Sequence, residues 1–162
     1  MELQLKRPIV FLDLETTGTN IGTDRIIEIA LLKVHPGGKR ESKVHRINPT
    51  IPIPAETTKI HGISDEDIKD APTFKQLAQD FVAFLGGADL AGYNSNKFDI
   101  PILIEEFTRA GIDFPIADRK LVDVQNIFHK MEQRTLSAAF KFYCDKDLIN
   151  AHSAEADTMA TY

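Results

Sequence analysis

The first third of the chain alternates short apolar runs with turn residues, which predicts three β-strands. A nearly continuous apolar run covers residues 8–14 and leads into a turn at 15–18, as expected for a buried central strand. A second run over 26–34 stops at the Pro-Gly-Gly turn of 36–38, and an alternating stretch over 42–48 predicts a third strand across that hairpin. We expect these three strands to form an antiparallel meander.

The rest of the chain alternates predicted helices with predicted strands. Apolar residues at i, i+3, i+4, i+7, i+8 and i+11 predict an amphipathic helix over 74–85, which ends at the Gly-Gly pair that follows it. Strands are expected at 89–93 and 120–124. Further helices are expected at 55–60, 98–110, 125–131, 136–143 and from 153 onward.

This order of elements predicts an α/β fold. Crossover helices imply parallel neighbouring strands, whereas the opening hairpins imply antiparallel ones, so we expect a mixed five-stranded sheet with helices on both faces. The 162 residues are sufficient for one domain with its own core. The helix expected from residue 153 has no glycine stop or proline after it, which predicts a single domain trimmed in its C-terminal helix.

The composition is that of a soluble globular protein, with 43% hydrophobic and 27% charged residues. No apolar run approaches the length of a bilayer span, so no membrane association is expected. Charges flank the short apolar run near the N-terminus, unlike a secretory signal. The single cysteine, Cys144, excludes an internal disulfide. These features predict a cytoplasmic location.

The net charge limits how this chain could bind nucleic acid. It has 19 Lys and Arg residues against 24 Asp and Glu residues, a net charge of -5. This is the wrong sign for a protein that holds DNA through phosphate neutralisation alone. Cations bound to carboxylates would invert the local potential, so a nucleic-acid interpretation requires bound metal ions.

Four acids and one histidine lie beside apolar or glycine-containing segments that would place them near one end of the sheet. Asp13 and Glu15 are two residues apart on a strand, so their carboxylates point to the same side and can share a cation. Asp99 follows a second predicted strand. His152 and Asp157 are five residues apart, roughly 140° around a helix, so we expect His152 to precede the helix that carries Asp157.

Three motifs resemble those of the DnaQ-like DEDDh 3′→5′ exonucleases, a family that includes the proofreading subunit of bacterial DNA polymerase III. The resemblance covers nearly the whole chain, although Gly92-Tyr93-Asn94 replaces the more usual His-Asn pair of the second motif. The segment 61–63 is similar to the family loop that packs against the terminal nucleotide. The motifs lie at 13–18, 94–99 and 152–157, the last one being H-x4-D.

The resemblance implies an RNase H-like fold and hydrolysis of terminal phosphodiesters to nucleoside 5′-monophosphates, with two divalent metal ions, Mg²⁺ or Mn²⁺, as cofactors. It assigns the general base to His152 and metal binding to Asp13, Glu15, Asp99 and Asp157. The implied partners are a single-stranded DNA or RNA 3′ end and a DNA polymerase catalytic subunit. The implied substrate-binding residues are Thr16, Thr17, Gly18, His61, Ile63, Asn94 and Phe98.

Each feature taken alone has a plainer explanation. Asp99 could cap a helix, His152 could be an ordinary exposed side chain, and 16–18 could be a simple turn. Phe98 and Ile63 could belong to the core. The joint pattern favours a nuclease, because clustered buried carboxylates repel one another unless a cation neutralises them. A stand-alone trimming exonuclease and a non-catalytic nucleic-acid or polymerase-binding module remain the alternatives to a proofreading subunit.

Overall fold

A computed structural model describes residues 4–131 together with 141, 144 and 149. The chain divides into two compact units, Met1–Val124 and Gln125–Tyr162. The predicted site residues His152 and Asp157 lie outside the described residues. Within the described part, no helix combines the length and apolar character needed to cross a membrane.

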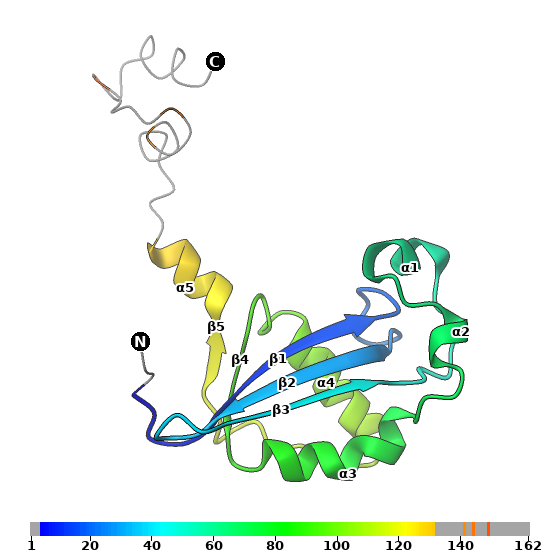
Figure 1. The fold of residues 1–162 in the computed structure, drawn as a ribbon, viewed down its shortest axis with the longest axis horizontal. Coiled ribbons are helices and arrows are strands. Elements are labelled where there is room, and N and C mark those ends of the chain that lie inside the picture. The colour runs from blue at the N-terminus through cyan, green and yellow to red at the C-terminus, as the bar shows by residue number, and fades with distance from the viewer. Residues whose placement is uncertain (1–3, 132–140, 142–143, 145–148, 150–162) are drawn as a thin grey trace. The chain divides into compact units, whose positions relative to one another are not determined.

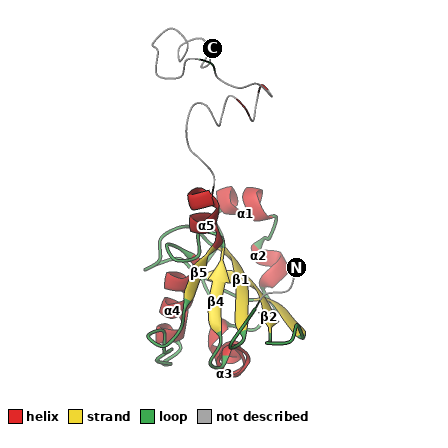
Figure 2. Cartoon of the chain, turned by 90° about the vertical axis from the view of Figure 1, so that its left-hand side faces the viewer, coloured by secondary structure: helices red, strands yellow, loops and turns green. Residues whose placement is uncertain are grey.

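The first unit is built on a mixed five-stranded sheet, as predicted. Its strands are β1 (Ile9–Thr16), β2 (Ile26–Val34), β3 (Arg40–Arg46), β4 (Asp89–Gly92) and β5 (Leu121–Asp123). The strand order is β3-β2-β1-β4-β5. The first three strands run antiparallel to one another, whereas β4 is parallel to β1 and β5 is parallel to β4. Figures 1 and 2 show this central β1 with β2 on one side and β4 on the other.

The helices follow the predicted pattern with one addition. They are α1 (Ala55–His61), α2 (Asp65–Ile68), α3 (Phe74–Leu85), α4 (Asp99–Arg109) and α5 (Val124–Met131). The prediction did not include α2, because four residues are too few to show a helical period. A reciprocal capping box between Ser64 and Asp67 begins it.

The strand predicted over 42–48 lies over Arg40–Arg46, two residues earlier. Ile47 and Asn48 lie beyond the strand, where each contacts a segment that is distant in the sequence. The N–H of Ile47 donates to the carbonyl of Ile27, and Asn48 forms an isolated bridge with Thr73. The hydrophobic residue at the end of the alternating stretch is therefore buried beyond the strand and does not extend it.

The main core fills the space between one face of the sheet and helices α3 and α4. Val10, Leu12 and Leu14 of β1 point into it, and Phe74 and Phe107 from the two helices meet with ring centroids 5.1 Å apart. Burying large side chains of this kind stabilises a fold by about 1.5–3 kcal/mol each. This packing fixes α4 against β1 and therefore sets where α4 begins.

The opposite face of the sheet carries Phe11, Asp13, Leu32 and Val44. Counting the described residues alone, this face is partly open, with Val44 65% exposed. The helices predicted at 136–143 and from 153 fall almost wholly outside those residues.

Candidate active site

The carboxyl-terminal half of β1 presents two acids on one face. Burial alternates along the strand, with Leu12 and Leu14 buried, Asp13 exposed and Glu15 partly buried. Asp13 and Glu15 therefore share the face that is opposite the main core, as the period of a strand predicts. Glu15 also pairs in register with Glu28 of β2. Two like charges side by side on neighbouring strands disfavour the fold unless positive charge compensates them.

Asp99 lies beside these two acids although it is far from them in the sequence. It is the first residue of α4 and is buried, with 6% of its surface exposed. Phe98, not Asp99, occupies the N-cap position of α4, so the capping interpretation of Asp99 does not apply. The Asp99 carboxylate accepts hydrogen bonds from its own backbone and from the backbone of Leu14, the residue between Asp13 and Glu15.

The pairing of the strands leaves space for this contact. β4 pairs with β1 only over Ile9–Phe11, so the end of β1 extends past β4. The start of α4 then lies alongside the exposed edge of β1. Asp99 thus lies near Asp13 at the carboxyl end of β1.

The negative charge of Asp13 acts on both of the other carboxylates. Burial, followed by the charge of Asp13, raises the pKa of Asp99 to about 6. Burial and the charge of Asp13 also raise the pKa of Glu15, while nearby His61 acts in the opposite direction. A bound cation would relieve this repulsion and restore the ionised forms.

Asp123 holds the loop of the second motif in place. Its Oδ1 accepts a hydrogen bond from the N–H of Asn94 at 2.9 Å, and its Oδ2 accepts one from the N–H of Asn96 at 3.2 Å. Asn94 has a φ of 56°, a left-handed conformation that costs energy for a residue with a side chain. At Gly92, an added Cβ would lie 2.9 Å from the carbonyl oxygen of Leu12. The loop is therefore packed tightly against the end of β1.

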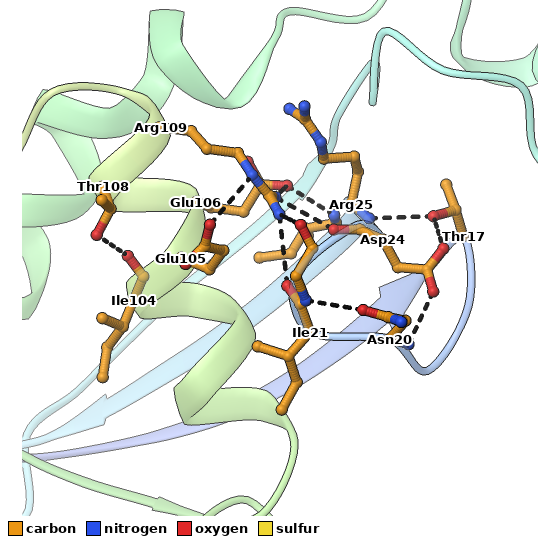
Figure 3. A network of polar contacts seen from close by, with 12 residues as sticks. Thr17, Asn20, Ile21, Asp24, Arg25, Ile104, Glu105, Glu106, Thr108 and Arg109 are labelled. Carbon is orange, nitrogen blue, oxygen red and sulfur yellow. Dashed lines mark hydrogen bonds and ion pairs between the residues drawn. The ribbon is translucent and has the colours of Figure 1, made fainter.

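The turn after β1 is closed by its own side chains. Thr17 is 1% exposed; its N–H donates to the carbonyl of Arg25, and its hydroxyl donates to Asp24 Oδ1 at 2.7 Å (Figure 3). The hydroxyl of Thr16 donates to the carbonyl of Gly18 at 2.6 Å. The N–H of Thr17 is thus engaged within the protein. Contact of Thr16, Thr17 and Gly18 with a substrate stays a prediction.

Arg109, at the end of α4, holds the same turn from the other side. Its guanidinium donates to the carbonyl oxygens of Ile21, Gly22 and Asp24 (Figure 3). The helix that begins at Asp99 therefore ends by holding the loop that follows Glu15.

His61 and Ile63 differ in what they offer to a ligand. The Nδ1 of His61 accepts a hydrogen bond from the N–H of Ile63 at 3.1 Å, which places the proton of the neutral ring on Nε2. That Nε2 is buried and has no partner within the described structure. Ile63 is 3% exposed in a second core cluster with Ile27, Ile53 and Ile68. Contact between Ile63 and a nucleotide stays a prediction that its burial does not favour.

Phe98 is partly buried and packs against the main core. As far as the described residues go, no group of three or more His, Cys, Asp or Glu side chains is already arranged to hold a metal ion. The donor chemistry nevertheless fits one. Carboxylate oxygens are the ligands that Mg²⁺ and Mn²⁺ prefer, and the raised pKa values of Glu15 and Asp99 mark negative charge that such a cation would offset.

Comparison with known proteins assigns this site to a class. The family model RNase_T, described as Exonuclease, matches residues 10–162, and the chain belongs to this exonuclease family. It is 28% identical over 161 residues to DNA polymerase III PolC-type of Caldanaerobacter subterraneus, covering 99% of this chain and 11% of that protein. It is 32% identical over 144 residues to DNA polymerase III subunit epsilon of Buchnera aphidicola, covering 85% of this chain and 58% of that protein. The chain thus spans less than two thirds of either relative.

Solved structures show the same fold. Escherichia coli exonuclease I in complex with a dT13 oligonucleotide aligns with a TM-score of 0.70 at 20% identity, over 96% of this chain and 39% of that one. The zinc-bound form of the exonuclease I complex with single-stranded DNA aligns equally well, with a TM-score of 0.70 at 20% identity, over 97% and 39% of the two chains. The RNase H-like fold implied by the motifs is confirmed.

Proposed function

We propose that this chain is a 3′→5′ exonuclease that removes nucleoside 5′-monophosphates from the ends of single-stranded DNA. The observation that supports this most directly is the contact of Asp99 with the backbone of Leu14, which brings the Asp99 carboxylate close to Asp13. Membership of the exonuclease family supports the same activity. The fold alone would not specify it, because one fold serves many functions.

Asp13, Glu15, Asp99 and Asp157 would hold two divalent cations, with Mg²⁺ or Mn²⁺ as the expected ions. When bound, such ions offset the charge of the phosphodiester and of the leaving 3′-oxygen. The description of one exonuclease I complex as zinc-bound is consistent with a metal site in this fold. Asp99 lies close to Asp13, so Asp157 would have to approach the carboxyl end of β1 to complete this set of ligands.

The remaining residues would orient the substrate and move a proton. His152 would accept a proton from the attacking water, because imidazole titrates near neutral pH. The unpartnered Nε2–H of His61 is available as a donor beside Glu15. Thr16 and Gly18 would offer backbone groups to the terminal sugar, and Asn94 and Phe98 would lie near the last nucleotide. Contacts to sugar, phosphate and ring faces tolerate any base.

The relatives suggest a setting for the activity. Two of them are named as DNA polymerase III proteins, which supports a proofreading role beside a polymerase catalytic subunit in the cytoplasm. A stand-alone enzyme that trims DNA or RNA is the second candidate. A non-catalytic binding module is disfavoured, because the chain keeps all four acids and His152.

The direct test is release of labelled mononucleotide from a 3′-labelled single strand by the full-length chain with Mg²⁺ or Mn²⁺. We expect release by the wild type and by Asp80→Ala, which alters an exposed acid of α3, but none by Asp13→Ala. Absence of release by a folded wild-type chain would favour the binding module. Competition between labelled DNA and RNA strands would then identify the preferred substrate.

A further inference from the structure

A cavity lined by several charged residues lies beside Arg25. It has a volume of about 260 Å³ and lies where Arg25, the start of α3 and the end of α4 meet. The residues that matter for its chemistry are Arg25, Thr73, Phe74, Lys75, Glu106 and Arg109. No part of the proposed hydrolysis uses this cavity.

The guanidinium of Arg25 is not fully satisfied by hydrogen bonds within the described residues. Its Nε is buried and has no hydrogen-bond partner in the described part of the chain, where no carboxylate forms an ion pair with it either. In Figure 3 its side chain extends away from the contacts made by Arg109. The backbone of Arg25, in contrast, is fixed on both sides by Thr17. A buried donor without a partner is unfavourable, so a ligand that accepts a hydrogen bond from it would be stabilising.

The other charges that line the cavity do not satisfy Arg25. Arg109 directs its guanidinium to backbone carbonyls of the neighbouring turn. Glu106 accepts a hydrogen bond from the N–H of Ile26 at 3.1 Å and lies 3.6 Å from Arg109. Lys75 is exposed and adds a further cation. Of the described residues that line the cavity, three are cations and Glu106 is the acid, so the positive charge is in excess.

The first turn of α3 adds to this positive potential. The helix has twelve residues and begins after Thr73, whose hydroxyl caps the N–H of Gln76. The N–H groups of Phe74 and Lys75 belong to the part of a helix that has no intrahelical acceptor. Such a helix start carries a partial positive charge that favours phosphate.

We propose that this cavity binds a phosphate group, with the Arg25 guanidinium and the first turn of α3 as its donors. The phosphate could be free, as inorganic phosphate or a nucleotide, or it could be a phosphodiester within a bound strand. The second source is consistent with the position of the cavity, because Arg25 is hydrogen-bonded to Thr17, two residues after Glu15. The proposal does not rest on the exonuclease activity.

The charge of Arg25 could have a purely structural role instead of binding phosphate. Arg25 could serve only to offset the charge of Glu106, whose pKa is raised by burial and lowered by Arg25. In that case its replacement would change stability without affecting any phosphate. A binding measurement therefore decides between the two explanations, and a stability measurement alone does not.

The experiment is a nuclear magnetic resonance titration of the ¹⁵N-labelled full chain with inorganic phosphate, at constant ionic strength and without divalent metal. We expect saturable shifts of the amides of Phe74 and Lys75 and of the Arg25 Nε–H. Arg25→Gln should weaken phosphate binding about tenfold, as loss of a charge-assisted hydrogen bond predicts, whereas Arg40→Gln, an exposed arginine of β3, should not. Lys75→Ala, an exposed change that leaves the core intact, should weaken it several-fold.

A parallel titration with a short oligothymidylate identifies the source of the phosphate. Saturable shifts with the oligonucleotide that need Arg25, but none with inorganic phosphate, would assign the cavity to the strand. Shifts with both ligands would assign it to phosphate in general. Absence of saturable shifts with either ligand, or equal affinities in wild type, Arg25→Gln and Lys75→Ala, would overturn the proposal. Mononucleotide release measured separately would still report on the exonuclease.

Discussion

Asp123 accepts a hydrogen bond from the backbone N–H of Asn94 at 2.9 Å, which joins the end of β5 to the loop that leads into Asp99. Its other oxygen accepts from the N–H of Asn96, so both oxygens of the carboxylate are in use. An acid is suited to this position because an ionised carboxylate is acceptor-only, whereas an amide has one acceptor and one donor end. Asp123 therefore positions the loop of the second motif.

We predict that Asp123→Asn distorts this loop. The amide leaves one of the two backbone N–H groups without an acceptor and opposes it with an NH₂, which should cost about 1–3 kcal/mol of stability. Because the loop sets the start of α4, nucleotide release should also fall by tenfold or more. Thermal denaturation and the release assay measure the two effects. The exposed Asp113→Asn is the matched control, and an Asp123→Asn chain that is fully active would contradict the positioning role.

The raised pKa of Asp99 predicts an unusual dependence of stability on pH. An acid whose pKa is about 6 in the folded chain, against an ordinary value of 3.8, favours the folded state when protonated. Its contribution is fully present below about pH 4 and is lost as the pH rises through about 6. Without metal, Asp99→Asn should therefore be more stable than the wild type at pH 7.5, by up to about 3 kcal/mol, with the difference shrinking toward pH 4.

Urea denaturation with a chelator at pH 4 and pH 7.5 measures this difference. Added Mn²⁺ should stabilise the wild type, because a ligand that binds only the folded state raises its stability, and should stabilise Asp99→Asn much less. Equal stabilities of the two chains at both pH values would show that the folded chain does not raise the pKa of Asp99.

A substitution at Gly18 would show how closely the turn after β1 is packed. An added Cβ at Gly18 would lie 2.6 Å from Oδ2 of Asp24, the carboxylate that binds the Thr17 hydroxyl and the N–H of Asn20. Gly18→Ala should therefore displace Asp24 and cost about 1–3 kcal/mol in the free energy of unfolding. Gly22→Ala is the control, since its nearest atom, Oδ1 of Asn20, would lie at an ordinary 3.5 Å.

A double variant shows whether Asp24 is the cause. In Gly18→Ala combined with Asp24→Ala, the clash is absent, so the two costs should fall well short of additive. Strict additivity in urea denaturation would mean that Gly18 matters for another reason.

Much of the fold could be predicted because its signals are local. The helix at Phe74–Leu85 was predicted with its exact bounds, since a stripe of apolar residues ends at a glycine pair. The antiparallel and parallel halves of the sheet followed from short and long connections. The prediction did not include α2, because its four residues are too few to show a helical period. It placed β3 two residues late, because contacts of Ile47 and Asn48 with distant segments decide where that strand ends.

Some residues of the candidate site could also be predicted from local sequence patterns, and others could not. Asp13 and Glu15 could be paired from the two-residue period of a strand, and Asp99 from its place after another strand. Asp24, Arg109 and Asp123 were not predicted, because they act through hydrogen bonds to backbone groups between 4 and 88 residues away and carry no local spacing. An acid at the end of a predicted strand was the only sequence signal for Asp123.

The assignment of His152 as the general base makes the sharpest prediction for activity. His152→Ala should slow mononucleotide release by about 10²–10⁴-fold, the usual contribution of acid–base catalysis, and should leave Mn²⁺ affinity unchanged. Asp13→Ala should lose both activity and Mn²⁺ affinity, since Asp13 is one of the acids proposed to hold the cations. His129→Ala on α5 is the control for removal of a histidine. Added imidazole should restore part of the rate of His152→Ala, and an unchanged rate in that variant would assign the proton transfer to another group.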